Sequence, residues 1–316
     1  MANELTVTAG NGTANAATQA AAITEELTRK FIRFVDAAPQ SIATYNASIR
    51  RMLDFFRTRK ITQPTRADIL QYRDELKAQY KPASVALHMT AARLFFRWTA
   101  QEGYYPNIAD HVKGAKLDRG HKKDYLTSGQ VKAVFNTAEG TGTASKRDRA
   151  ILAIMVTAGL RCIEVCRANI EDVRTAGDSA ALFIQGKGHE EKTDYVKLAA
   201  PVEKALRDYL TDRGETDGKA PLFVSDSNNS RGSRITTRSV SRLVKNHMRA
   251  AGYDSERLTA HSLRHTAATL NLLNGATLEE TRQLLRHTSI NTTLIYSHAL
   301  ERAANNSEAR IAAAVF

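Results

Sequence analysis

Apolar residues in the first third of the chain recur at helical spacing. Ile23, Leu27, Phe31 and Val35 stand four residues apart, which places them on one face of a helix that Pro39 would end. Similar patterns predict three more helices, and no run in this part alternates as a strand does. These helices are expected over residues 41–59, from Thr65 (with Asp68 in the first turn), and from Pro82 to Gly103. An all-helical domain is therefore predicted over residues 21–114.

The rest of the chain has a mixed but mainly helical pattern. Residues 112–125, VKGAKLDRGHKKDY, show no apolar period, and we expect residues 115–125 to form a linker. Residues 126–316 predict a second domain in which helices dominate. One short β section is expected, because residues 181–184 and 195–198 are apolar or alternating runs that flank the turn-like segment QGKGHEEKTD. The predicted fold class is mainly α, with two domains and a small antiparallel sheet.

Charge suggests a partner for these domains. The chain has 45 Lys+Arg against 33 Asp+Glu and a net charge of +12, which indicates a polyanion, nucleic acid first and an anionic membrane surface second. Residues 21–120 alone carry 17 basic and 10 acidic residues. The alternative for each basic residue is a solvated helix face. The candidates for contact with the phosphates of such a nucleic acid are Arg50, Arg51, Arg93, Arg97, Lys122, Lys123 and Arg242.

Composition excludes several other classes of protein. Cys162 and Cys166 are the only cysteines, too few for a disulfide scaffold or a four-thiolate metal site, so a reducing cytoplasm is expected. Their spacing favours small thiols packed in a core. The longest apolar stretch, residues 150–160, is about half of a membrane span. Residues 1–20 lack the features of a signal peptide and predict a flexible tail.

Two basic residues stand where an anionic ligand would suit them. Arg161 directly follows the apolar run AILAIMVTAGL, where a cation is costly to bury unless an anion meets it. The alternative is an ion pair with Glu164 or another acid. Lys187 stands between two glycines at the tip of the expected hairpin, where it could project toward a ligand or simply be solvated.

Histidines, an arginine and a tyrosine follow in two further segments. His261 and His265 flank Arg264 in HSLRH at a spacing that could suggest zinc, but the glutamate of H-E-x-x-H is missing and the arginine would repel a cation. An anion suits this segment better. In LLRHTSINTTLIYSH, His287 precedes Tyr296 by nine residues. A tyrosine becomes a nucleophile at neutral pH only where a base and nearby cations favour its phenolate.

The order and spacing of these residues closely resemble the tyrosine recombinase (phage integrase) family. The matching motifs are G-L-R-x-x-E, G-K-G, H-x-L-R-H, L-L-x-H and T-T-x-x-Y, and the resemblance covers about 290 residues. It implies an N-terminal core-binding (SAM-like) domain of four or five helices and a mixed, mostly helical catalytic domain, which together clamp duplex DNA. The catalytic residues that it implies are Arg161, Lys187, His261, Arg264, His287 and Tyr296.

The resemblance assigns a role to each of these residues. Tyr296 would attack the scissile phosphate, while Arg161, Arg264 and His287 would hold its non-bridging oxygens. The remaining two would transfer protons, His261 as general base and Lys187 as general acid. Glu164 would support Arg161, and His265 would be structural. Religation would need no ATP, because the phosphotyrosyl bond conserves the energy of the phosphodiester. The sequence has no Walker loop and no carboxylate cluster that suggests Mg²⁺, which is consistent with transesterification without a cofactor.

The resemblance also implies an assembly and leaves alternatives open. The apolar C-terminal tail would pack on a neighbouring protomer in a tetramer on a specific DNA site, and the short N-terminal tail favours a two-domain, Xer-like organisation. Relatives often have glycine where this chain has Arg286, which would contact DNA or point to solvent. The alternative functions are a type IB topoisomerase-like relaxase and a DNA-binding regulator without catalysis. Host resolution and mobile-element integration are equally compatible with these residues.

Overall fold

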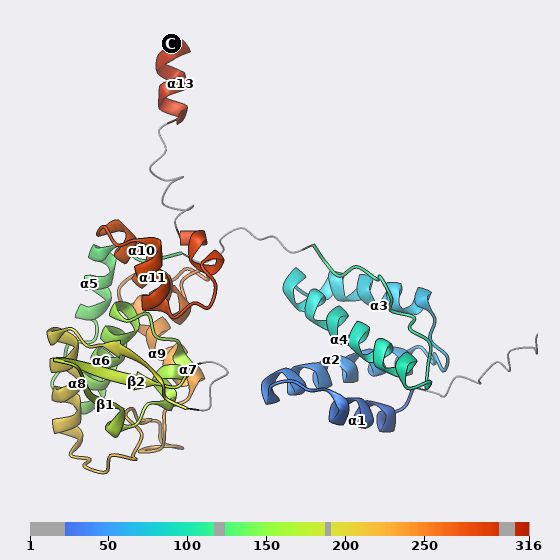
Figure 1. Cartoon of the computed structure of the whole chain (residues 1–316), viewed down its shortest axis with the longest axis horizontal. Helices are drawn as coiled ribbons and strands as arrows, with labels where there is room; N and C mark the ends of the chain where they lie inside the picture. The colour runs from blue at the N-terminus through green and yellow to red at the C-terminus, as the bar shows by residue number, and fades with distance from the viewer. Residues whose placement is uncertain (1–22, 117–123, 187–190, 297–306, 316) are drawn as a thin grey trace, which may run out of the picture. The chain divides into compact units, whose positions relative to one another are not determined.

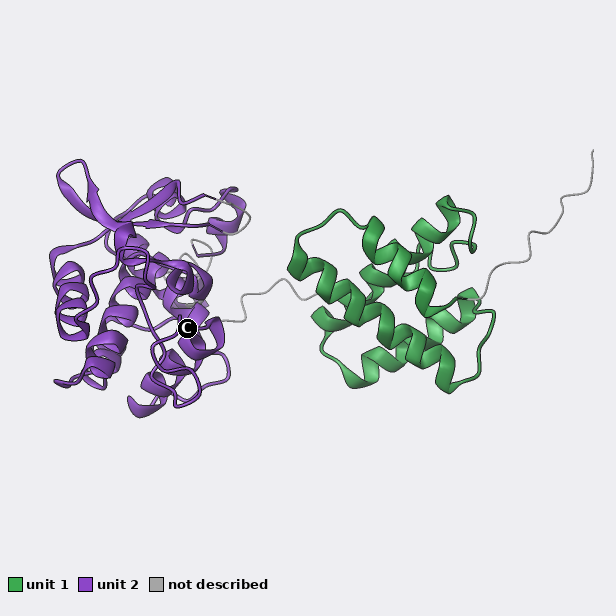
Figure 2. Cartoon of the chain, turned by 90° about the horizontal axis from the view of Figure 1, so that it is seen from below, with its two compact units in different colours: residues 1–119 green, residues 120–316 purple. Residues whose placement is uncertain are grey.

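The computed structural model describes residues 23–116, 124–186, 191–296 and 307–315. The chain divides into two compact units, residues 1–119 and 120–316 (Figure 2). Both are mainly helical, and the second contains a small antiparallel sheet, so the predicted fold class is confirmed. No helix in the described parts is long and apolar enough to cross a membrane.

The described residues of the N-terminal unit, 23–116, form four helices, as the apolar pattern predicts (Figure 1). Their bounds are α1 Glu25–Phe34, α2 Pro39–Thr58, α3 Arg66–Gln79 and α4 Pro82–Gln101. Thr65 caps α3 and shares a capping box with Asp68, as expected. Helix α1 ends at Phe34, before Pro39 as predicted, and Pro39 is also the first residue of α2, where its missing N–H costs no hydrogen bond.

Aromatic residues form the core of this unit. Phe95 is fully buried and contacts Phe31 edge-to-face, with ring centroids 5.4 Å apart. Met52 of α2 and Ile69 of α3 are also fully buried. The core joins all four helices, because residues of α1, α2, α3 and α4 belong to one apolar cluster.

In the C-terminal unit, further helices and the sheet surround one buried helix, α6 (Figure 1). Its α-helices are α5 Ser128–Asn136, α6 Thr143–Thr157, α7 Cys162–Arg167, α8 Ala200–Arg213, α9 Thr237–Ala250, α10 Ala260–Leu273, α11 Leu278–Leu285 and α13 Ser307–Val315. A 3-10 turn, Ile170–Asp172, precedes the sheet. The segment from residue 150 to 156 is buried throughout, which makes α6 the centre of the core. The helical spacing of Leu263, Ala267, Leu270 and Leu273 predicts that all four face inward, but Leu273 of α10 is 59% exposed.

The sheet has three antiparallel strands in the order β1-β2-β3. Strands β2 (Ser179–Ile184) and β3 (Asp194–Lys197) confirm the predicted hairpin, with Leu182 opposite Val196. Strand β1 (Val173–Ala176) was not predicted. Its four residues are too short a run to show a period, and the strand forms because a tight turn at Gly177 folds it onto β2.

A sharp bend separates α6 from α7, at the point where Arg161 follows the apolar run AILAIMVTAGL. Gly159 has φ +59°, and a Cβ at this position would lie 2.6 Å from Cδ2 of Leu285. The positive φ therefore favours glycine, and the Leu285 side chain of α11 packs into the space that a Cβ would need. The bend ends the buried helix and places Arg161 at the start of α7.

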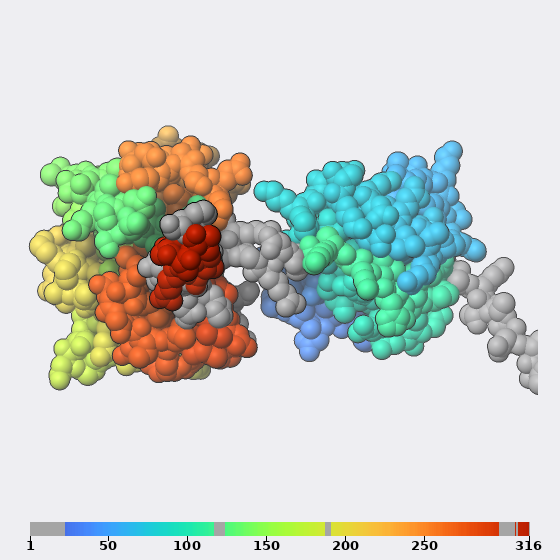
Figure 3. All heavy atoms as spheres, turned by 90° about the horizontal axis from the view of Figure 1, so that it is seen from above, coloured from blue at the N-terminus to red at the C-terminus, as the bar shows by residue number. Residues whose placement is uncertain are grey.

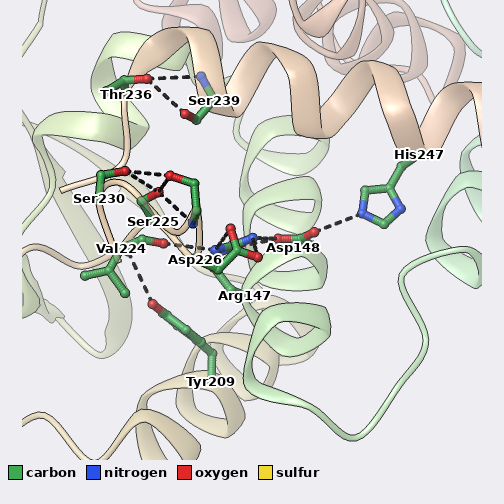
Figure 4. A network of polar contacts seen from close by, with 11 residues as sticks. Arg147, Asp148, Tyr209, Val224, Ser225, Asp226, Ser230, Thr236, Ser239 and His247 are labelled. Atoms are coloured by element: carbon green, nitrogen blue, oxygen red, sulfur yellow. Dashed lines mark hydrogen bonds and ion pairs between the residues drawn. The ribbon is translucent and has the colours of Figure 1, made fainter. Parts of the chain in front are cut away.

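A network of polar contacts fixes α9 and the loop around residue 225 against α6 (Figure 4). Arg147 of α6 is buried and forms ion pairs with Asp148 (2.7 Å) and Asp226 (3.1 Å). His247 of α9 contacts the other oxygen of Asp148 at 3.2 Å, and its second ring nitrogen lies 2.9 Å from the hydroxyl of Thr137. Every charge in this partly buried cluster has a partner, which is the condition under which burial is tolerated.

Candidate active site

Three arginines and a tyrosine gather where α6, α10 and α11 meet. The α6–α7 bend supplies Arg161, α10 supplies Arg264, and the residue after α11 is Arg286. Tyr296 is the last described residue of the helical segment 291–296. The bend at Gly159 brings these elements together, because it lets Leu285 at the end of α11 reach the end of α6.

Arg264 is the most deeply buried of the large side chains here, with 1% of its surface exposed. Its guanidinium donates to the carbonyl oxygens of Gly159 and Leu285. Both carbonyls lie just beyond or at the C-terminal end of a helix, where the dipole favours a cation. Burial and the neighbouring cations Arg161 and Arg286 lower the pKa of Arg264 to about 9, so it remains charged at neutral pH.

Arg161 forms an ion pair with Glu164, the pairing that the sequence leaves open as an alternative. Nη1 of Arg161 lies 2.7 Å from Oε1 of Glu164, and the backbone N–H of Arg161 donates to Oε2 at 2.8 Å. Although burial opposes ionisation of Glu164, the positive charges of Arg286 and Arg161 outweigh it and hold its pKa below the usual value. The Arg161 side chain keeps 29% of its surface exposed, so the pair does not close it off from a ligand.

Arg286 does not point to solvent, which is one of the two placements that the sequence leaves open, but into the site. Its Nη2 lies 2.9 Å from Oε2 of Glu164, and its side chain is only 11% exposed. The carbonyl oxygens of Leu284 and Ala158 accept from its Nη1. Sequence reasoning missed this placement, because only the three-dimensional fold reveals that the end of α11 faces Glu164.

His287 is buried beside the three arginines. Its Nδ1 lies 2.9 Å from the hydroxyl of Thr293. Burial, together with the charges of Arg264, Arg161 and Arg286, lowers the pKa of His287 to about 4. The imidazole is therefore neutral at pH 7, and when the Thr293 hydroxyl donates to Nδ1 the ring carries its proton on Nε2.

This low pKa predicts a pH dependence of stability. Because the folded pKa of about 4 lies below the ordinary value of 6.5, the unfolded chain binds more protons between these values, and stability falls as the pH drops from 6.5 to 4. We expect His287→Gln to reduce this loss by about 2–3 kcal/mol. Thermal unfolding of both proteins between pH 4 and 7.5 measures the difference, and parallel pH profiles would contradict it.

Tyr296 lies among the histidines. Its ring centroid is 5.2 Å from that of His265 and 6.5 Å from that of His287, and His265 in turn contacts His261 with centroids 4.7 Å apart. Burial raises the pKa of Tyr296, while Arg264 and Arg161 act to lower it. His261 is exposed and Tyr296 is 4% exposed, so the cluster runs from the surface inward.

Similarity to known proteins matches this arrangement. Residues 124–302 match the model of the phage integrase family, and residues 25–105 match its N-terminal SAM-like domain. The tyrosine recombinase XerC of Pelobacter propionicus is 32% identical over 83% of this chain and 85% of its own, and XerC of Thermodesulfovibrio yellowstonii is 33% identical over 71% and 73%. The chain belongs to the phage integrase, or tyrosine recombinase, family.

The fold of the recombinase agrees with this membership. The XerH site-specific recombinase bound to palindromic difH substrate, in a post-cleavage complex, aligns with a TM-score of 0.70 over 90% of this chain and 84% of its own, at 22% identity. This likeness concerns the fold. In the recombinase, Lys187 lies outside the described residues, as do Lys122 and Lys123. No group of three metal-ligating side chains occurs within the described segments.

The arginines that are predicted to contact DNA differ in their exposure to solvent. Arg50 and Arg51 are exposed and line a groove of about 520 Å³ between α2 and α3, where Arg51 also lies over the ring of Tyr80. The end of α2 through α3, in light blue, forms a broad part of the surface of this unit (Figure 3). By contrast, Arg93 is half-buried and donates to the carbonyl of Val112 at 2.8 Å. The remaining two, Arg97 and Arg242, are exposed.

Proposed function

We propose that Tyr296 cuts one DNA strand by attacking the scissile phosphate. The phenolate oxygen would form a 3′-phosphotyrosyl bond while the bond to the 5′-oxygen breaks, and that oxygen would leave as a 5′-hydroxyl after taking up a proton. As a member of its family the chain is a DNA strand-transferase, so the proposal concerns which residues carry the reaction. The observation that carries it is the position of Tyr296, whose ring centroid lies 5.2 Å from that of His265 and 6.5 Å from that of His287 and whose side chain packs with Leu285, the residue whose carbonyl accepts from Arg264.

Arg161 and Arg264 would hold the non-bridging oxygens of the phosphate. Arg161 is partly exposed, and Arg264 is fixed by two carbonyls, so the pair offers one accessible and one rigid guanidinium. His287 would add a neutral hydrogen-bond donor through Nε2. His261, at the exposed end of the histidine cluster, would accept the tyrosine proton, and Lys187 would protonate the leaving 5′-oxygen. Glu164 would hold Arg161, and His265 would pack between His261 and Tyr296.

A suicide duplex tests this proposal. A nick near the scissile phosphate lets the cleaved fragment diffuse away, so that wild-type protein accumulates as a covalent adduct. We expect mass spectrometry of the digested adduct to find the nucleotide on Tyr296. Attachment of the nucleotide at another residue would overturn the assignment of Tyr296. The absence of an adduct on every duplex that carries an end of the protein's native DNA element would also overturn it. Relaxation of supercoiled plasmids lacking a recombination site would favour the topoisomerase-like alternative, and binding without an adduct would favour a regulator.

Several basic residues would anchor the DNA without taking part in the chemistry. Arg50, Arg51, Arg97 and Arg242 are exposed and suit phosphate contacts. Arg93, Lys122 and Lys123 complete the proposed set, although Arg93 already donates to a carbonyl of its own domain.

For the domain organisation, we propose a tail at residues 1–20, a core-binding domain at 21–114, a linker at 115–125 and a catalytic domain at 126–316. The partner would be a specific duplex site in the cytoplasm, on the nucleoid.

The C-terminal helix would join four protomers on DNA. Ile311 and Val315 of α13 are 64% and 68% exposed, which leaves their apolar surface available to a neighbour. Deleting residues 308–316 is expected to reduce the cooperativity of DNA binding at least about tenfold, with little change in thermal stability. Gel-shift titration on a two-site duplex measures the cooperativity, with Ala313→Ser in the same helix as a mild control. Unchanged cooperativity in the deletion variant would refute this role of the helix.

A further inference from the structure

Arg286 adopts a backbone conformation that its residue type does not favour. It ends α11 with φ +55° and ψ +45°, the left-handed region in which glycine is the usual residue. This backbone conformation is higher in free energy for arginine than for glycine, and the charged side chain is also largely buried. Both costs require compensation from the contacts that the side chain makes.

Those contacts bind Arg286 to the same carboxylate that holds Arg161. Glu164 is completely buried, and its Oε2 lies 2.9 Å from Nη2 of Arg286 while its Oε1 lies 2.7 Å from Nη1 of Arg161. Oε2 also accepts the backbone N–H of Arg161. One carboxylate thus bridges two guanidiniums, each on its own oxygen.

The carbonyls around Arg286 and Arg264 form a second link. Arg264 donates to Gly159 and Leu285, and Arg286 donates to the residues immediately before them, Ala158 and Leu284. Two adjacent guanidiniums therefore tie the end of α6 to the end of α11. Three arginines surround the single carboxylate of Glu164, and Asp194 adds one further negative charge near Arg286, so these described residues keep an excess of positive charge.

We propose that Arg286 is a positioning residue for strand cleavage, which acts by sharing Glu164 with Arg161. The proposal rests on the assignment of Arg161 to the scissile phosphate. Of the two guanidiniums that share Glu164, Arg161 is the more accessible to a ligand, with 29% of its side chain exposed against 11% for Arg286. By occupying Oε2, Arg286 fixes the carboxylate in the orientation that holds Arg161 and takes up part of its negative charge. Arg161 thereby stays oriented and retains charge for the developing phosphorane.

The test compares substitutions of Arg286 in the full-length protein on a suicide duplex. Arg286→Gln removes the charge, and we expect single-turnover cleavage to slow about 10- to 100-fold while the DNA affinity changes less than about threefold. Arg286→Lys should recover a substantial part of the rate. Arg207→Gln on the exposed side of α8 removes one cation of the same unit and serves as the matched control, with an expected rate within about twofold of wild type.

A double-mutant cycle separates positioning from a structural role. If Arg286 acts through Glu164, then Arg286→Gln should cost much less in an E164Q background, or even raise the rate there, because the shared carboxylate is gone. An equal loss in both backgrounds would overturn the proposal. A merely structural residue would instead lower thermal stability and cleavage in parallel, without recovery by lysine.

Two further outcomes are also decisive. If Arg286→Gln does not fold, Arg286→Gly replaces it, because glycine suits the left-handed conformation; failure of both to fold would show that the arginine serves the fold and would overturn the proposal. If wild-type protein forms the adduct and Arg286→Gln cleaves at the wild-type rate, this inference alone is overturned. Absence of a wild-type adduct would overturn the proposed function and this inference with it.

Discussion

Replacing Tyr296 with Phe is expected to abolish the covalent protein–DNA adduct and to lower strand cleavage at least about 10⁴-fold. The substitution removes only the hydroxyl oxygen, which is the atom proposed to form the bond to phosphorus. The ring that packs beside His265 and His287 remains, so the free energy of unfolding should change by no more than about 1–2 kcal/mol. Adduct yield on the suicide duplex and thermal unfolding measure the two quantities.

The matched control is Tyr195→Phe in strand β3. Tyr195 is 47% exposed and its ring contacts Phe183, so its hydroxyl can be removed without touching the site. This variant should form the adduct at the wild-type rate. Cleavage that persists in Tyr296→Phe would assign the nucleophile to another residue, whereas loss of DNA binding in parallel with cleavage would make Tyr296 a binding residue.

The apolar pattern was sufficient to predict the helices of the N-terminal unit. Their cores depend on residues such as Phe31 and Met52, whose spacing is visible in the sequence and whose burial follows directly from it. The hairpin of β2 and β3 was also predictable, because its two runs flank a glycine-containing turn. Strand β1 was not, because a four-residue edge strand is defined by its partner rather than by its own pattern.

The candidate site was predictable in its members but not in its connections. Motif spacing singled out Arg161, Arg264 and Tyr296, which the fold brings together through the bend at Gly159. No local signal showed that Arg286 would share Glu164, because these residues are 122 positions apart in the chain. Long-range ion pairs depend on how helix ends meet, which periodicity cannot report. The position of Arg286 before His287 nevertheless marked it as a departure from the family pattern.

Replacing Arg264 with Lys is expected to slow cleavage at least about 100-fold while most DNA affinity remains. A lysine keeps the positive charge, but it cannot donate in two fixed directions to Gly159 and Leu285 and also to a phosphate. Affinity depends on many other phosphate contacts, so the dissociation constant should change less than about fivefold. Single-turnover cleavage and fluorescence anisotropy with the same duplex measure both effects.

Arg264→Ala distinguishes the structural from the chemical part of this arginine. It leaves two buried carbonyls without their donor and a cavity between α6 and α11, so we expect a loss of about 2–5 kcal/mol in the free energy of unfolding of the C-terminal unit. Arg264→Lys should lose less, since its ammonium can still reach one carbonyl. If the lysine variant were as unstable as the alanine variant, its slow cleavage would reflect a damaged fold. If both were as stable as wild type, the guanidinium would serve the phosphate and would not hold α6 to α11.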